Sequence, residues 1–71
     1  MEDISNIILT ELREERGLSQ AELAYKLDLS PSTISAYEQG VRTPRDKVKV
    51  RIAEFFGVSV FDIFYKTERA S

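Results

Sequence analysis

The chain has 71 residues, a net charge of −2, and neither cysteine nor histidine. This length predicts a single domain near the lower size limit for a core without covalent or metal staples. The missing thiols exclude a disulfide framework and a thiolate metal site, and the missing imidazoles remove the commonest general base and metal ligand. No apolar run reaches the length of a membrane span, and the acidic start is unlike a signal peptide, so a cytoplasmic location is expected.

The first predicted element is a helix over residues 3–16. Its apolar residues recur at helical spacing: Ile4, Ile7, Ile8 and Leu12. Gly17 follows as a residue suited to end the helix. Leu9 lies off this stripe, which leaves it either partly exposed or covered by the C-terminal part of the chain.

A second helix is predicted to begin at Gln20. Ser19 and Glu22 have the spacing of a capping box, in which the hydroxyl accepts a backbone N–H and the carboxylate accepts another in return. The apolar residues of this segment fall on one side of the helix: Leu23, Ala24 and Leu27. A short connection then leads directly to the next helix.

A third helix is predicted over residues 31–39, with Ser30 as its N-cap. Only Ile34 and Tyr37, with Ala36 beside them, are available for burial. The rest of its surface carries short, uncharged hydrogen-bonding side chains: Ser32, Thr33, Ser35 and Gln39. A helix held by so narrow an apolar seam, with a hydrogen-bonding face outward, suits the DNA major groove, although an ordinary solvated face is the alternative.

The next stretch is ambiguous because residues 47–51 alternate with the period of a strand. A longer window resolves the pattern, since its apolar residues follow helical spacing: Val48, Ile52, Phe55 and Phe56. We therefore predict a fourth helix over 45–56, opened by Pro44 and ended by Gly57.

A short fifth helix is predicted from Ser59 to about residue 65. Ser59 and Asp62 form a second capping box. The domain is expected to span residues 1–66, followed by a polar tail over 67–71.

Charge is divided unevenly along the chain. Residues 1–15 carry five acids against one base, a net of −4, whereas residues 42–51 carry five bases against one acid, a net of +4. Such a division would orient the molecule on a phosphate backbone, although a charge run is often only a solvated face. Because the basic run directly follows the candidate reading helix, the first interpretation is favoured.

The chain resembles the helix-turn-helix domain of the phage repressor/Cro superfamily, also called the XRE family. The resemblance covers about residues 5–65 and is carried by these fragments: Leu18-Ser19-Gln20-Ala21-Glu22-Leu23-Ala24, Leu29-Ser30, Ile34-Ser35, Tyr37-Glu38, Gly40, Arg42-Thr43-Pro44, Ile52-Ala53 and Phe56-Gly57-Val58-Ser59. It implies an all-α, five-helix repressor/Cro-like globule. The expected core is Ile4, Ile8, Leu12, Leu23, Ala24, Leu27, Ile34, Tyr37, Ile52, Ala53, Phe56, Val58 and Ile63.

The resemblance also implies which residues contact DNA. In the family a glutamine at the start of the second helix binds a phosphate, and residues of the third helix and the following loop read bases or hold phosphates. The corresponding residues are Gln20, Ser30, Ser32, Thr33, Ser35, Ala36, Gln39, Arg42, Arg45 and Lys47, with Lys49 as a further phosphate neighbour. The base-reading part offers no arginine or asparagine for a bidentate contact, so water or DNA shape should contribute more than usual.

Three other features bear on the resemblance. Arg13 and Glu38 match a pair that forms an interior salt bridge in several family members, the alternative being two separate surface charges. Asp28 stands where the family usually has glycine in a left-handed turn, a conformation that aspartate tolerates better than most residues. Asp46 stands where an apolar residue is usual, which leaves the start of the fourth helix open.

Aromatic residues crowd the C-terminal part of the chain: Phe55, Phe61, Phe64 and Tyr65. An exposed aromatic patch made by the last three, Phe61, Phe64 and Tyr65, is a candidate dimer interface. The equally open alternative is that these side chains wrap over Leu9 within one molecule.

The sequence therefore predicts a sequence-specific, double-stranded-DNA-binding transcriptional regulator of the repressor/Cro type. A homodimer on a palindromic operator is expected, because one such domain covers only a half-site. No enzymatic activity, cofactor, metal, membrane partner or small-molecule effector is expected. The alternative is a protein-interaction module of the same fold, similar to an antitoxin or anti-repressor, which would have no use for the basic segment or the polar third helix.

Overall fold

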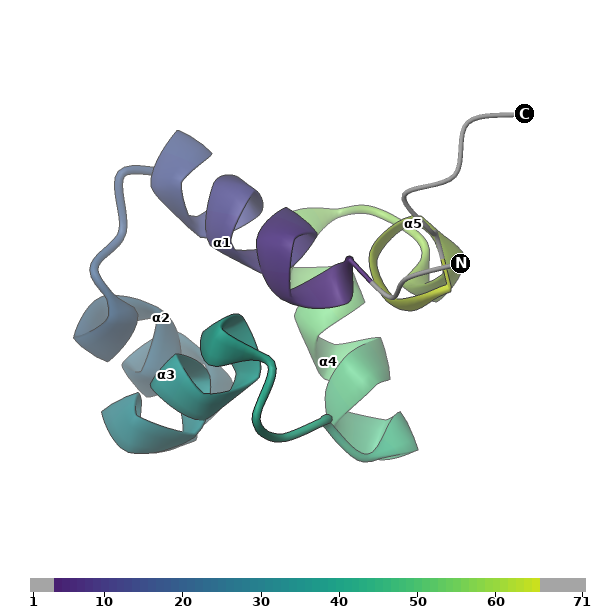
Figure 1. Cartoon of the computed structure of the whole chain (residues 1–71). Coiled ribbons are helices and arrows are strands. Elements are labelled where there is room, and N and C mark those ends of the chain that lie inside the picture. Colours follow the sequence, from purple (N-terminus) through teal and green to yellow (C-terminus); the bar gives the residue numbers. More distant parts are fainter. Residues whose placement is uncertain (1–3, 66–71) are drawn as a thin grey trace.

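The computed structural model describes residues 4–65, which form five helices and no strand. In chain order these are α1 (Ser5–Glu15), α2 (Gln20–Leu27), α3 (Pro31–Gln39), α4 (Asp46–Phe56) and α5 (Val60–Phe64). The all-α, five-helix prediction is confirmed (Figure 1). The predicted tail at 67–71 and the domain boundary at 66 lie outside the described residues.

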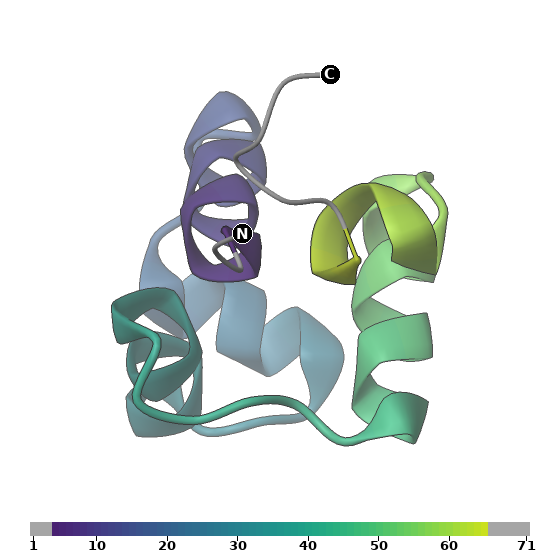
Figure 2. The same cartoon turned by 45° about the vertical axis from the view of Figure 1, so that its right-hand side comes forward.

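The helices divide between two sides of the molecule. In Figures 1 and 2, α3, the loop after it and the first turn of α4 lie along the lower side, whereas α1 and α5 lie along the upper side. α2 packs against both α3 and α4, and α1 packs against α3 and α5. This arrangement puts the basic loop and the start of α4 on the same side of the molecule as α3.

Local capping signals fix the helix starts as the sequence predicts. The Ser19 hydroxyl accepts the Glu22 N–H at 3.0 Å, and the Glu22 carboxylate accepts the Ser19 N–H at 2.8 Å. Ser59 and Asp62 make the same reciprocal pair at the start of α5. At the end of α2, Asp28 has φ 59°, so aspartate does adopt the left-handed conformation that the family usually gives to glycine.

The start of α4 differs from the prediction by one residue, and Pro44 has a different role. The helix begins at Asp46, with Arg45 as N-cap, so Pro44 precedes the helix and does not open it. Pro44 is buried against the domain instead. Asp46 then lies in the first turn, where a carboxylate interacts favourably with the helix dipole, and this explains how a polar residue is accommodated there.

The core is a single cluster to which all five helices contribute. It consists of Leu9, Leu23, Ala24, Leu27, Ile34, Tyr37, Ile52, Ala53, Phe56, Ile63 and Phe64. Leu9, which lies off the predicted stripe of α1, is 1% exposed because α5 packs against that side of α1. The same packing buries Phe64 to 6% exposure, so the prediction that Phe64 belongs to a dimer surface is wrong.

Other predicted members of the core lie at its margin. Four of them are only partly buried: Ile4, Ile8, Leu12 and Val58. Ile7, part of the predicted stripe, is 52% exposed. The stripe of α1 is thus rotated toward Leu9.

No helix within residues 4–65 has both the length and the apolar character needed to cross a membrane.

Candidate nucleic-acid interface

The outer surface of α3 is a row of hydroxyls anchored at its N-terminal end. The Ser30 hydroxyl accepts the Thr33 N–H at 3.2 Å and lies 3.1 Å from the Ser32 hydroxyl and 2.8 Å from that of Thr33. One turn further on, the Gln39 amide donates to the Ser35 hydroxyl at 2.9 Å. The inner side of the helix buries only Ile34 and Tyr37. The predicted polar face of α3 is therefore turned outward.

The loop after α3 brings the first of the basic residues to this side. Gly40 has φ 78° and ends α3, and the N–H groups of Val41 and Arg42 both donate to the Ala36 carbonyl. Val41, for which the sequence predicts no role, is 70% exposed beside Arg42. Its position in a loop that begins at Gly40 agrees with the predicted end of the third helix at residue 39.

The five bases of residues 42–51 fall into two groups. Arg42, Arg45 and Lys47 are exposed, and within residues 4–65 no carboxylate forms an ion pair with any of them. Their charges are available to a ligand of opposite sign.

Lys49 and Arg51 are engaged inside the domain. The Lys49 ammonium lies 5.7 Å from the centre of the Phe64 ring and 5.0 Å from that of the Tyr65 ring. The Arg51 guanidinium donates to the Leu27 carbonyl at 2.8 Å, at the end of α2. Lys49 thus points toward α5, and the structure does not support its expected place beside the phosphate-binding residues.

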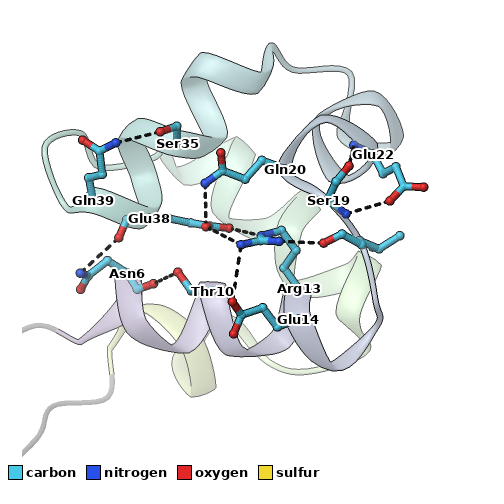
Figure 3. A network of polar contacts seen from close by, with 11 residues as sticks. Asn6, Thr10, Arg13, Glu14, Ser19, Gln20, Glu22, Ser35, Glu38 and Gln39 are labelled. Atoms are coloured by element: carbon cyan, nitrogen blue, oxygen red, sulfur yellow. Dashed lines mark hydrogen bonds and ion pairs between the residues drawn. The ribbon is translucent and has the colours of Figure 1, made fainter.

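A network of polar contacts ties α1, α2 and α3 together (Figure 3). Arg13 and Glu38 form the ion pair that the resemblance implied, with Nε to Oε2 at 2.6 Å and Nη2 to Oε1 at 3.1 Å. The third donor of Arg13, Nη1, binds the Leu18 carbonyl at 2.7 Å. Only 13% of the Arg13 side chain and 6% of the Glu38 side chain are exposed. The pair is therefore bidentate and largely shielded from water.

The network also sets the protonation of Glu38. Burial raises the pKa of this carboxyl, but hydrogen bonds from Arg13 and Gln20 and the charge of Arg13 together bring the pKa below its ordinary value. The hydrogen bond with Glu38 likewise raises the pKa of Arg13. Both groups are consequently charged at neutral pH.

Two amides extend this network. The Gln20 Nε2 donates to Glu38 Oε1 at 3.0 Å, so the residue expected at a DNA phosphate has one N–H already engaged. The Asn6 Nδ2 donates to the Glu38 carbonyl at 3.4 Å, from the first turn of α1. The sequence does not predict this contact, because nothing in the local pattern around Asn6 links it to a residue 32 positions away.

The C-terminal aromatic residues separate into buried and exposed members. Phe64 belongs to the core, whereas Phe61 is 63% and Tyr65 is 53% exposed. Tyr65 lies beside Lys49, and its hydroxyl is 3.5 Å from the Lys49 ammonium. The domain thus buries Phe64 in its own core and leaves the rings of Phe61 and Tyr65 facing outward, and these two rings stay predicted members of a dimer interface.

A helix-turn-helix family model, HTH_3, matches residues 9–63, which includes all of α2, α3 and α4. The chain belongs to this family, the XRE family of helix-turn-helix proteins. In this XRE domain, α2 and α3 are the two helices of the motif, and Asp28 lies in the turn between them.

Several relatives of this XRE domain are named as regulators. An uncharacterized HTH-type transcriptional regulator of Methanocaldococcus jannaschii is 46% identical over 52 residues, which cover 73% of this chain and 79% of that protein. The HTH-type transcriptional regulator RamB of Mycobacterium tuberculosis is 50% identical over 48 residues, covering 68% of this chain and 10% of RamB. The cryptic phage CTXphi transcriptional repressor RstR of Vibrio cholerae is 32% identical over 60 residues, covering 84% of this chain and 54% of RstR.

The chain therefore spans about a tenth of RamB and about half of RstR. Among solved structures, a transcriptional regulator from Listeria innocua superposes with a TM-score of 0.86 at 21% identity. That superposition covers 100% of this chain and 66% of the other, and it establishes the shared fold.

Proposed function

We propose that this XRE domain binds double-stranded DNA and regulates transcription, with α3 reading bases in the major groove. The observation that carries the proposal is the coincidence of two features on one side of the molecule. α3 turns its hydroxyls outward, and the exposed bases Arg42, Arg45 and Lys47 extend from the loop to the first turn of α4. The names of the relatives support the same function.

The proposal assigns two kinds of contact. Ser32, Thr33 and Ala36 lie nearest the base edges, where hydroxyls pair with several bases and a methyl group can touch thymine. The phosphate contacts come from residues that flank these on either side: Gln20, Ser30, Ser35, Gln39, Arg42, Arg45 and Lys47. Phosphate contacts set affinity and register, and base contacts set sequence preference.

A homodimer on a palindromic operator follows from the size of the domain. One reading helix covers a half-site only, and two-fold symmetric proteins place two such helices one helical turn apart. Phe61 and Tyr65 are the remaining candidates for the dimer surface, since both are exposed on α5 and after it. The second candidate function is a protein-interaction module, because the same exposed rings could contact a protein partner.

Selection of binding sites from random duplex DNA tests the proposal. We expect an enriched half-site repeated as a palindrome, which would report sequence preference and spacing together. Ala36→Gln should change the preferred base at one position of each half-site, because an amide replaces a methyl group. Arg42→Gln, the comparison variant, should weaken binding to every sequence by a similar factor. No enrichment by the parent protein would favour the interaction module.

A further inference from the structure

Gln20 is held by an acidic residue of the reading helix before any DNA is present. Resting on the proposed function, we propose that Glu38 is a positioning residue that orients Gln20 toward a phosphate of the DNA backbone. The ion pair between α1 and α3 would then act on DNA affinity through Gln20. The proposal concerns only the backbone contact of Gln20 and assigns Glu38 no direct contact with DNA.

The contact with Glu38 fixes which end of the Gln20 amide points inward. A carboxylate can only accept hydrogen bonds, so it can hold the NH2 group of the amide and never its carbonyl oxygen. Glu38 Oε1 accepts from Gln20 Nε2 at 3.0 Å and from Arg13 Nη2 at 3.1 Å. Figure 3 shows the Gln20 carbonyl oxygen pointing away from Glu38. One N–H of the amide stays available beside the N-terminus of α2, where an anion is favoured.

The charge of Glu38 does not oppose a nearby phosphate, because Arg13 compensates it. Both oxygens of the carboxylate are engaged by the guanidinium, at 2.6 and 3.1 Å. The pair carries no net charge and exposes little surface to solvent. An acidic residue can therefore orient Gln20 at the DNA surface without repelling the backbone.

The expected gain comes from ordering the side chain before binding. A glutamine that is mobile in the unbound protein loses rotamer freedom when it binds, and this loss weakens affinity. Removing the constraint should cost about three- to tenfold in affinity, the range that one immobilised side chain implies. Removal of the Gln20 amide should cost at least as much, because it removes the phosphate contact itself.

A double-mutant cycle on DNA affinity tests the proposal. Gln20→Met removes the amide at similar size. Glu38→Met removes both carboxylate oxygens at similar size, and with them the acceptor of the Gln20 amide. Each variant, measured while folded by circular dichroism, should bind a short mixed-sequence duplex about three- to tenfold more weakly than the parent. The double variant should bind no more weakly than Gln20→Met alone.

Gln39→Met supplies the matched control, since the Gln39 amide donates to Ser35 and not to Glu38. Its effect on affinity should multiply with that of Glu38→Met. If the effects of Gln20→Met and Glu38→Met also multiply while the parent still binds DNA, the positioning role is overturned. Failure of the parent to bind any duplex would overturn the proposed function itself.

A second measurement needs no variant of Glu38, whose loss could unfold so small a domain. The chain contains one asparagine and two glutamines, so its side-chain amides give only three NH2 pairs in an NMR spectrum. In the DNA-free protein, the order parameter of the Gln20 amide should approach the roughly 0.85 of rigid backbone. A value below about 0.6, typical of flexible groups, would overturn the proposal.

Discussion

Lys47 and Lys49 offer a matched test of which bases face DNA. They lie two residues apart on α4, yet Lys47 is exposed and the Lys49 ammonium lies over the rings of Phe64 and Tyr65. The same substitution, lysine to glutamine, removes one charge at each position. Only Lys47→Gln should remove a phosphate contact, because the Lys47 side chain, unlike that of Lys49, is available to the DNA backbone.

The magnitude follows from counterion release. Each phosphate contact contributes about 0.9 to the slope of log affinity against log salt. Loss of one contact should lower the slope by about that amount, and the affinity penalty should shrink about three- to fourfold between roughly 50 and 200 mM salt. For Lys49→Gln we expect the parental slope, with a loss of stability of about 0.5–1 kcal/mol from the cation–π contacts.

Fluorescence anisotropy of a labelled duplex across a salt series measures both slopes. A parental slope in Lys47→Gln would remove the first turn of α4 from the DNA surface. An equal loss in both variants would show that Lys49 leaves the aromatic rings when DNA binds, which contradicts the division of bases described above.

Three further predictions concern stability, measured by urea denaturation. Phe64→Ala should cost about 3–5 kcal/mol and Phe61→Ala less than about 0.5 kcal/mol, and equal costs would contradict the docking of α5 on α1. Because the folded pKa of Glu38 lies below its unfolded value, the contribution of Glu38 to the free energy of unfolding should be complete above about pH 5 and be lost as the pH falls through the folded pKa. Glu38→Gln should therefore reduce the loss of stability in acid. An unchanged loss would assign it to other carboxylates. At the left-handed position 28, Asp28→Ala should be about 1 kcal/mol less stable than Asp28→Gly, and the reverse order would contradict the backbone strain.

The sequence predicts best those features that depend on neighbouring residues. Capping boxes at Ser19 and Ser59 are reciprocal contacts between residues three positions apart, so their spacing alone reports them. The left-handed turn at Asp28 is predicted through the resemblance, since the family places glycine there. The starts of α2 and α5 and the two helices of the motif could therefore be assigned from the sequence.

Features that depend on how distant elements dock could not be predicted in the same way. Leu9 is off the apolar stripe of α1 and becomes buried only because α5 packs there, which also buries Phe64. Apolar spacing within α5 cannot tell Phe61 from Phe64 without knowing which side meets α1. Likewise, the contact between Gln20 and Glu38 joins residues 18 positions apart. It can be predicted only when the angle between α2 and α3 is known.

The orientation of α3 requires more than its apolar seam. Ile34 and Tyr37 are three residues apart and are buried along a single line on one side of α3. Two such contacts constrain rotation of α3 about its long axis only weakly. Glu38 lies beside this line and is bound by Arg13 of α1 and by Gln20 of α2, while its backbone carbonyl accepts from Asn6. These contacts oppose rotation because they pull on one edge of the helix from two other helices. A buried ion pair contributes little net stability, so its effect here is better understood as directional. The polar contacts of Glu38 therefore contribute, from the opposite end of α3, to the direction in which Ser32 and Thr33 point.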